Sequence, residues 1–257
     1  MKILLPLLLV VVLGPATGLA QLSCGSSVGK GEKVTLGANV GPCDGVDAAL
    51  VVDSGTLDLG GFTVACADTN LDGDLPQGVV LTGKKARLMN GAVVGCSNGV
   101  GLAGQGKHRV EGVTVTGSAD DGIDIAQGDK NKLVGNTTAS NASDGIYVRT
   151  DKNKISDHVT VGNGEDGLDV PASGEKNKLT RVRAEQNADS GIEVGGSKNK
   201  VALGTAMQNG GPGFLLGGSK NKVRGGVSMA NAGPDVSGCS GNSVKNLSFT
   251  TASADCQ

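Results

Sequence analysis

Pairs of hydrophobic residues, separated by one residue, recur along this chain at nearly constant intervals. They are Val34/Leu36, Leu57/Leu59, Val79/Leu81, Val100/Leu102, Ile123/Ile125, Ile146/Val148, Leu168/Val170, Ile192/Val194 and Phe214/Leu216, and the pattern fades at Val236/Gly238. Successive pairs are 21 to 24 residues apart. Because alternate residues of a strand point to the same side, each pair is expected to point inward and the residue between its members outward. The period predicts a solenoid of stacked β-coils.

Two series of asparagines share this period. The first is Asn131, Asn153, Asn177, Asn199, Asn221 and Asn242, and the second is Asn141, Asn163, Asn187, Asn209 and Asn231. Stacked asparagines can hydrogen-bond from coil to coil and satisfy turn backbone that would otherwise be buried without a partner. We therefore expect two amide ladders, with His108 taking the asparagine position of the first.

The repeated order Asn-x-Ile, then Asn, then Asp-Gly-Ile resembles the right-handed parallel β-helix family, the fold of pectate lyases and polygalacturonases. The resemblance covers roughly residues 32–249. It implies an all-β fold, a right-handed parallel β-helix solenoid of about ten coils with terminal caps. It does not extend to the catalytic motifs of these enzymes. Asp120-Asp121-Gly122-Ile123-Asp124 resembles only the first catalytic motif of polygalacturonases, Asn-Thr-Asp-Gly, and the later motifs are missing. Asp157-His158 lacks the arginine pattern of pectate lyases.

The chain divides into four segments. Residues 1–20 have a lysine followed by an apolar run and small residues, which is typical of a secretory signal peptide. Residues 21–50 are expected to form an N-terminal cap and the first coil, 51–249 the β-helix, and 250–257 a C-terminal tail or cap. The protein is thus expected to be secreted, periplasmic or at the cell surface.

The cysteine content supports export. Six cysteines, an even number, lie after the expected signal peptide, which favours disulfides. Fifteen pairings are possible for six cysteines. Proximity along the chain and the coil layout favour Cys24–Cys43, Cys66–Cys96 and Cys239–Cys256.

Charge and composition narrow the classes of molecule that this protein is expected to bind. The formal net charge is −2, so nothing global indicates nucleic acid, and no segment after the expected signal peptide is apolar enough to insert in a membrane. The chain has no Trp, one Tyr and three Phe. Neutral sugars usually stack on aromatic rings, whereas acidic sugars can be held by charge. An acidic polysaccharide is therefore the expected partner.

The outward column contains the candidate catalytic residues. Its members are Thr35, Asp58, Val80, Gly101, Asp124, Tyr147, Asp169, Glu193, Leu215 and Ser237. Arg149 lies two residues after Tyr147 and should face the same way. Asp124, Tyr147, Arg149 and Asp169 would then form one patch in which a cation neutralises a uronate carboxylate and Tyr147 moves a proton, its pKa lowered by Arg149. The alternative is a solvated polar sheet face.

A turn column of aspartates precedes these strands. Asp121, Asp144 and Asp166 each stand before a glycine, as in aspartates that cap tight turns. Calcium bridging these carboxylates is a second interpretation, and glycosidase chemistry is a third. Apart from calcium, no cofactor is expected.

Lysines flank each asparagine of the first series except Asn242. The pairs are Lys130/Lys132, Lys152/Lys154, Lys176/Lys178, Lys198/Lys200 and Lys220/Lys222. Asp129, Asp151 and Glu175 should compensate the first three pairs, leaving the last two uncompensated. Lys198, Lys200, Lys220 and Lys222, with Glu193, are therefore the candidate binding residues. The alternative is a lysine-protected edge that discourages association between sheets.

Three functions stay open on this evidence. The first is an exported β-helix protein that binds, and in a stronger form of the hypothesis modifies, an acidic polysaccharide. The second is a uronan lyase or epimerase with a site at Tyr147 and Arg149. The third is a non-catalytic structural or adhesion rod at the cell surface.

Overall fold

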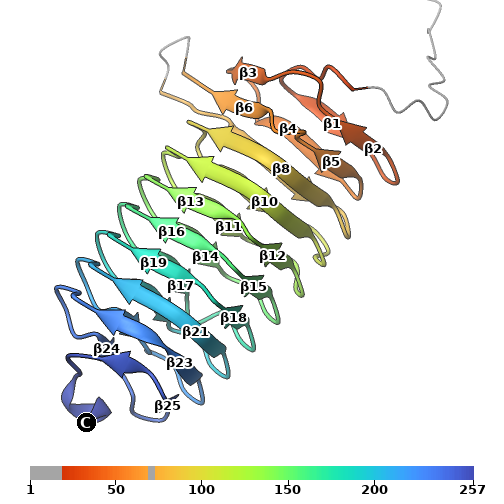
Figure 1. Cartoon of the computed structure of the whole chain (residues 1–257). Coiled ribbons are helices and arrows are strands. Elements are labelled where there is room, and N and C mark those ends of the chain that lie inside the picture. Colours follow the sequence, from red (N-terminus) through yellow and green to blue (C-terminus); the bar gives the residue numbers. More distant parts are fainter. Residues whose placement is uncertain (1–18, 69–72) are drawn as a thin grey trace, which may run out of the picture.

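The computed structural model describes residues 19–68 and 73–257 and shows a rod of stacked β-coils (Figure 1). Ten parallel strands, one from each coil, make up one sheet. They are β1 (Ser26–Val28), β4 (Ala48–Asp53), β7 (Gln77–Thr82), β9 (Val100–Leu102), β11 (Ile123–Ile125), β14 (Ile146–Val148), β17 (Leu168–Val170), β20 (Ile192–Val194), β22 (Phe214–Leu215) and β24 (Val236–Ser237). The predicted all-β, right-handed parallel β-helix of about ten coils is confirmed.

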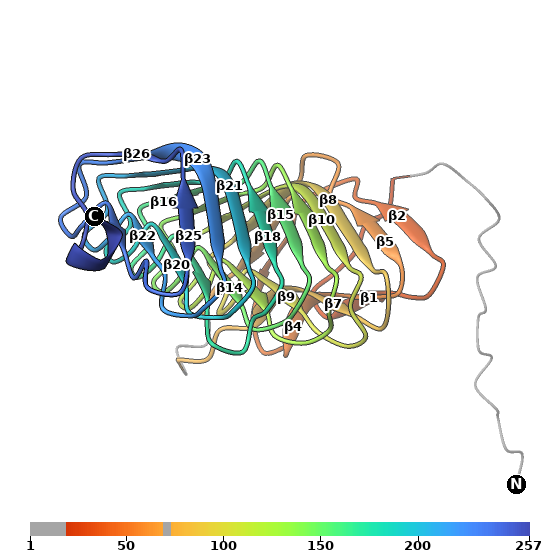
Figure 2. The same cartoon turned by 90° about the horizontal axis from the view of Figure 1, so that it is seen from below.

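A sixteen-stranded sheet closes the other sides of the rod (Figure 2). One row of its strands is β2 (Lys33–Thr35), β5 (Thr56–Asp58), β8 (Arg87–Val94), β10 (Arg109–Thr116), β12 (Lys132–Val134), β15 (Lys154–Ser156), β18 (Lys178–Thr180), β21 (Lys200–Met207), β23 (Lys222–Met229) and β25 (Ser243–Lys245). The others are β3 (Val40–Cys43), β6 (Thr63–Cys66), β13 (Thr137–Ala139), β16 (Val159–Val161), β19 (Arg183–Glu185) and β26 (Ser248–Phe249). The central coils thus have three strands, one more than the sequence pattern predicts.

The inward pairs stack in register through the middle of the rod. Ile123, Ile146, Leu168 and Ile192 are consecutive partners in the ten-stranded sheet, and all four are fully buried. Each coil can bury its apolar side only against its neighbours, so this column is the core of the molecule.

The predicted register is wrong at the first two coils. Val34 pairs with Leu57, and Leu57 with Leu88, all in the sixteen-stranded sheet. The true predecessors of Val79 and Leu81 are Leu50 and Val52. Thr35 and Asp58 therefore leave the outward column of the ten-stranded sheet. The error arose because a coil has two inward-facing sides with similar apolar spacing.

Both asparagine ladders are confirmed. The first ladder runs from His108 to Asn242. In it, each backbone N–H donates to the side-chain oxygen of the asparagine in the next coil, with N···O distances of 2.7–2.9 Å. The second ladder runs from Asn141 to Asn231. In it, the backbone and side-chain amides of each asparagine both donate to the side-chain oxygen of the next, with N···O distances of 2.8–3.2 Å. His108 joins the first ladder as expected and accepts the Ala86 N–H on Nδ1.

The three expected disulfides are present. Cys24–Cys43 lies at the N-terminal end, Cys66–Cys96 joins neighbouring coils, and Cys239–Cys256 fastens the 3-10 helix η1 (Ala254–Cys256) at the C-terminal end.

Nearly all of the expected signal peptide, residues 1–18, lies outside the described residues. Across the described ranges, no helix has the length and apolar character needed to cross a membrane.

Candidate functional sites

The predicted outward row exists on the ten-stranded sheet. Asp124 on β11 pairs with Tyr147 on β14, Tyr147 with Asp169 on β17, and Asp169 with Glu193 on β20. Three-residue strands with inward Ile, Leu or Val at both ends leave only the middle residue to point outward. The fold therefore places one polar side chain per coil in a line along this face.

Tyr147 and Arg149 are in contact, as predicted. The Arg149 guanidinium lies 5.1 Å from the centre of the Tyr147 ring, a cation–π distance. Arg149 also donates a hydrogen bond from Nη2 to Oδ2 of Asp124, within an ion pair. Asp124 is 7% exposed, so much of the charge of Arg149 is already matched inside the protein. That leaves less of it for a sugar carboxylate than the sequence suggests.

A hollow of about 270 Å³ surrounds this contact, and we call it the acidic hollow. Its lining residues are Asp120, Asp121, Ser143, Asp144, Tyr147, Arg149, Glu165 and Asp169. Five carboxyl groups and a single cation give it a negative field. The turn before each strand supplies most of these carboxyls, and the strand itself supplies Tyr147 and Asp169.

Burial holds protons on several of these carboxyls. It raises the pKa of Asp144 to about 8, that of Asp169 to about 7 and that of Asp121 to about 6. Repulsion between neighbouring acids acts in the same direction. Near neutral pH the hollow thus contains carboxylic acids beside carboxylates, the condition for a general acid and a general base in one site.

The pKa of Tyr147 departs from the prediction. It is raised, first by burial and then by the negative charge of Asp169, and Arg149 offsets these effects only in part. The lowered pKa expected from the nearby cation is therefore wrong. The sequence showed the cation beside Tyr147 but not the carboxyls that the fold places around both.

The turn aspartates have a structural role. Oδ1 of Asp121 accepts the backbone N–H of Asp144 at 3.1 Å, and Oδ1 of Asp144 accepts that of Asp166 at 2.8 Å. Asn98 occupies the preceding position and accepts the Asp121 N–H at 3.0 Å. These residues form a third ladder, consistent with the turn-capping interpretation.

Three carboxylates lie close enough to share a metal ion. Within the described part of the chain these are Asp166, Asp169 and Glu193, each with an oxygen within 4.8 Å of the others. Only Asp166 belongs to the set expected for calcium. Oδ1 of Asp169 is buried without a hydrogen-bond partner, and oxygen is the ligand that calcium prefers. The donor set therefore suits calcium, centred one strand further along than expected.

A second candidate site runs along the sixteen-stranded sheet, and we call it the cationic edge. Its strand row consists of residues paired coil to coil: Arg87, Arg109, Lys132, Lys154, Lys178, Lys200 and Lys222. Its turn row lies two residues earlier in each coil: Lys85, Lys107, Lys130, Lys152, Lys176, Lys198 and Lys220. The sequence pattern found the last five coils of this edge. The first two have Ala86 and His108 in place of Asn, and a search for alternating basic residues at the same period would have found them.

Compensation of the lysines differs from the prediction. Asp129 pairs with Lys152 of the next coil at 3.7 Å, and among the described residues Asp151 forms no ion pair. In the part of the chain that the structure describes, the lysines expected to be compensated that form none are Lys130, Lys132, Lys154 and Lys178.

Glu175 forms ion pairs with both Lys176 and Lys198, at 3.5 and 3.3 Å. Lys198 is therefore not uncompensated, because Glu175 reaches it from the preceding coil. Lys200, Lys220 and Lys222 form no ion pair within the described ranges, whereas Glu193 lies on the other sheet with Asp169.

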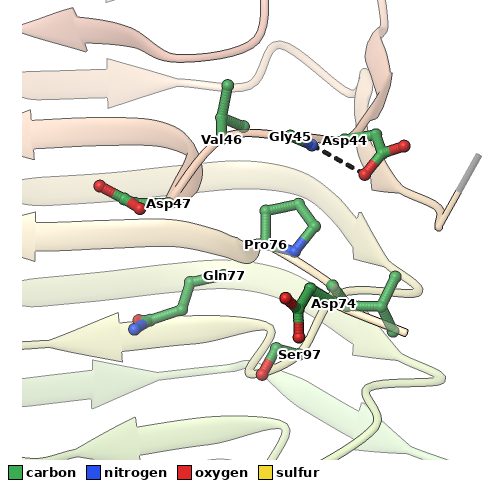
Figure 3. Close-up of a pocket in the computed structure, with 9 residues that line it drawn as sticks. Asp44, Gly45, Val46, Asp47, Asp74, Pro76, Gln77 and Ser97 are labelled. Atoms are coloured by element: carbon green, nitrogen blue, oxygen red, sulfur yellow. Dashed lines mark hydrogen bonds between the residues drawn. The ribbon is translucent and has the colours of Figure 1, made fainter. Parts of the chain in front are cut away.

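A further hollow, of about 510 Å³, lies near the N-terminal end of the rod (Figure 3). Its lining includes Asp47, Asp74 and Ser97, from the turns before β4, β7 and β9, and Gln77, the first residue of β7. The Gly45 N–H donates to the Asp44 carboxylate there at 2.7 Å. The sequence pattern does not single out any of these residues, because they belong to no periodic column.

Comparison with known families agrees with the architecture. The family described as "Right handed beta helix region" matches residues 77–228, more than half of the chain. The chain belongs to this family. No curated protein matches the sequence closely enough to count as a relative.

Several solved structures share the fold at low sequence identity. The A-module of the Azotobacter vinelandii mannuronan C-5 epimerase AlgE4 is 13% identical, with a TM-score of 0.60 over 90% of this chain and 81% of that one. The D317A mutant of the periplasmic alginate epimerase AlgG is 14% identical, with a TM-score of 0.59 over 88% and 71%. Pectate lyase Pel9A is 13% identical, with a TM-score of 0.58 over 90% and 68%. At these identities the likeness establishes the fold alone.

Proposed function

We propose that this right-handed β-helix protein is exported and binds an acidic polysaccharide along its cationic edge. One observation carries the proposal: seven coils in succession place an arginine or lysine at the same outward register of the sixteen-stranded sheet. Stacked like charges repel one another, so an uninterrupted row costs stability unless an anionic partner offsets it. A linear polyanion lying along the rod would contact one cation per coil.

The backbone of the turn row supports a role for its lysines. All seven have φ between 59° and 64°, the left-handed region that favours glycine. The neighbouring left-handed position of the same coils varies, from Gly112 and Gly135 to Asp157, Arg181 and Leu203. The turn row has lysine in all seven coils, which supports a role for its side chain.

The fold and its relatives are compatible with such a partner. Solved structures that share the fold include ones named as an alginate epimerase, a pectate lyase and a tailspike protein. Three disulfides fit an oxidising location, secreted, periplasmic or at the cell surface.

Binding to a uronan at several salt concentrations tests the proposal. Affinity should fall steeply as salt rises from 0.05 to 0.5 M, since exposed charges are screened beyond about 10 Å at 0.1 M. Changing Lys200, Lys220 and Lys222 together to Gln should weaken binding at least about tenfold. Changing Lys152 and Lys176, which already have acidic partners, is the matched control and should have a smaller effect. Equal losses in the two variants would instead favour a lysine edge that only discourages sheet association.

A second candidate function is a uronan lyase or epimerase at the acidic hollow. The contact of Tyr147 with Arg149, beside carboxyls that hold protons near neutral pH, is the observation that favours it. The negative field of the hollow opposes an acidic sugar, so this function needs a cation. Asp166, Asp169 and Glu193 would hold calcium, which would neutralise the sugar carboxylate.

Turnover of uronans, with and without calcium, tests this second function. Formation of an unsaturated product indicates a lyase, and a changed epimer ratio indicates an epimerase. Tyr147→Phe and Arg149→Ala should each lower the rate at least about a hundredfold if these residues move the proton and stabilise the developing charge. Full activity in both variants would remove the site from consideration. Binding without turnover on any uronan would leave a non-catalytic binding or adhesion rod.

A further inference from the structure

The cationic edge contains one hollow of its own, near its C-terminal end. It measures about 260 Å³ and is lined by Lys178, Lys200, Val201, Ala202, Lys222 and Arg224. Four of these six residues are cations, drawn from the three neighbouring strands β18, β21 and β23. Val201 and Ala202 give the hollow an apolar floor.

A small side chain opens this hollow. The second outward position of each strand, paired coil to coil, is occupied in turn by Glu111, Val134, Ser156, Thr180, Ala202 and Arg224. Alanine is the smallest of these side chains, and it lies in register between Thr180 and Arg224. A larger residue at this position would fill the space between the surrounding cations.

Within the described ranges, the cations around Ala202 are unmatched, as are Lys132 and Lys154 earlier in the strand row, whereas several nearby arginines are paired. Arg109, Arg181 and Arg183 pair with Glu111, Asp157 and Glu185. Among the described residues, Lys178, Lys200, Lys222 and Arg224 have no ion pair. Lys178, Lys200 and Lys222 are also stacked in direct register, so their repulsion is uncompensated within the protein.

We infer that this hollow is the subsite where an anionic substituent of the polysaccharide docks. Arg224 can bind a planar carboxylate or a sulfate ester through two parallel N–H bonds, and the three lysines supply further charge. The C–H face of a sugar ring would pack on Ala202. The inference rests on the proposed function, and it adds where along the edge the ligand is recognised and by which group.

Filling the hollow without touching a charge provides the test. The longer side chain introduced by Ala202→Met would project outward from β21 into the hollow. Val134→Met, at the same register on β12, is the matched control. The probes are polygalacturonate, dextran sulfate and uncharged dextran, with binding followed by calorimetry and folding by circular dichroism. Ala202→Met should weaken binding of the anionic polymers about tenfold, and Val134→Met should leave it unchanged.

The outcomes separate the subsite from the wider proposal. Arg224→Gln should reproduce the loss seen with Ala202→Met, because both remove the docking of the same group. If these substitutions weaken binding of polygalacturonate more, the docked group is a carboxylate. If they weaken binding of dextran sulfate more, it is a sulfate ester. Unchanged binding by Ala202→Met contradicts the subsite alone. No binding of either anionic polymer by the unmodified protein contradicts the function of the whole edge.

Discussion

Burial in the turn ladder changes the chemistry of individual carboxyls. Asp144 is 6% exposed, and its Oδ1 accepts one backbone N–H from the next coil. That hydrogen bond favours the charged form, but loss of water and the neighbouring Asp121 outweigh it, and the pKa rises to about 8. Asn98 makes the same ladder bond with an uncharged amide. The ladder therefore does not require a carboxylate at this position.

We predict that stability falls as pH rises from 6.5 to 8.5. In this range an unfolded aspartate is already ionised, whereas folded Asp144 still holds a proton, so the folded state binds more protons and loses stability as pH increases. One such group contributes about 1–2 kcal/mol across the range. Below pH 6.5 the buried His108 and His158, whose pKa values are lowered, have the opposite effect and make stability increase as pH rises.

Asp144→Asn isolates this effect. The variant should retain the ladder bond and unfold at higher denaturant concentration than the unmodified protein already at pH 6.5, where an unfolded aspartate is ionised, and this difference should be larger at pH 8.5. Asp151→Asn, in a turn where Oδ1 also accepts a backbone N–H from the next coil, is the control. If Asp144→Asn leaves the pH dependence of stability unaltered, that dependence arises from other groups.

At the scale of elements, the asparagine ladders determine how one coil joins the next. Asn187 is almost fully buried, and its Oδ1 accepts both the backbone and the side-chain N–H of Asn163, at 3.1 and 2.8 Å. Asn187 in turn donates to Asn209. Each ladder asparagine thus satisfies buried donors on the previous coil as well as its own.

Asn187→Ala should lower the free energy of unfolding by about 2–4 kcal/mol. The change leaves two buried N–H groups of Asn163 without an acceptor, and each costs about 1–3 kcal/mol. Urea denaturation followed by circular dichroism measures the loss. Gln208→Ala, at an exposed position in the next coil, should change stability by less than about 0.5 kcal/mol. Similar losses in the two variants would argue against a structural ladder.

The inward stack should be intolerant of charge. Leu168 is fully buried between Ile146 and Ile192, so Leu168→Asp should abolish cooperative unfolding, because an unpaired carboxylate would interrupt the core shared by three coils. Leu203→Asp is the control, since Leu203 is 55% exposed at a bend within β21 with a φ of 55° that aspartate tolerates. Normal melting of Leu168→Asp would contradict the stacking register.

At the scale of the whole molecule, the rod presents different charges on different sides. The ten-stranded face has the acidic hollow, and the cationic edge follows the sixteen-stranded sheet. The near-zero net charge conceals this separation, because 23 basic and 25 acidic residues almost cancel. Under the proposed function, charge patterning and not net charge would therefore govern which polymers the rod attracts.

The disulfides should stabilise the rod most at its ends, where a coil has a neighbour on one side only. Replacing Cys239 and Cys256 together by Ser should lower the melting temperature, with a loss of about 2–4 kcal/mol. Amide exchange should then rise in the last coil before the central coils. Peptide mapping without reduction should recover all three pairs in the unmodified protein. Equal exchange along the rod after the replacement would show that the C-terminal bridge does not protect that end.

The sequence by itself determined the features that repeat. A period of 21 to 24 residues specifies stacked coils, the inward pairs specify the core from Val79 onward, and the asparagine series specify the ladders. Pairing of the cysteines followed from the coil layout. These inferences succeed because a solenoid coil contacts only its neighbours, so each position recurs in sequence wherever it recurs in space.

Only the tertiary structure decided what depends on contacts between different columns. It moved Val34 and Leu57 to the other sheet, since apolar spacing alone does not distinguish two inward sides of one coil. It paired Arg149 with Asp124 and raised the pKa of Tyr147, because these effects depend on side-chain direction and burial. It also opened the hollow at Ala202, where the size of one side chain matters only relative to residues about 22 positions away.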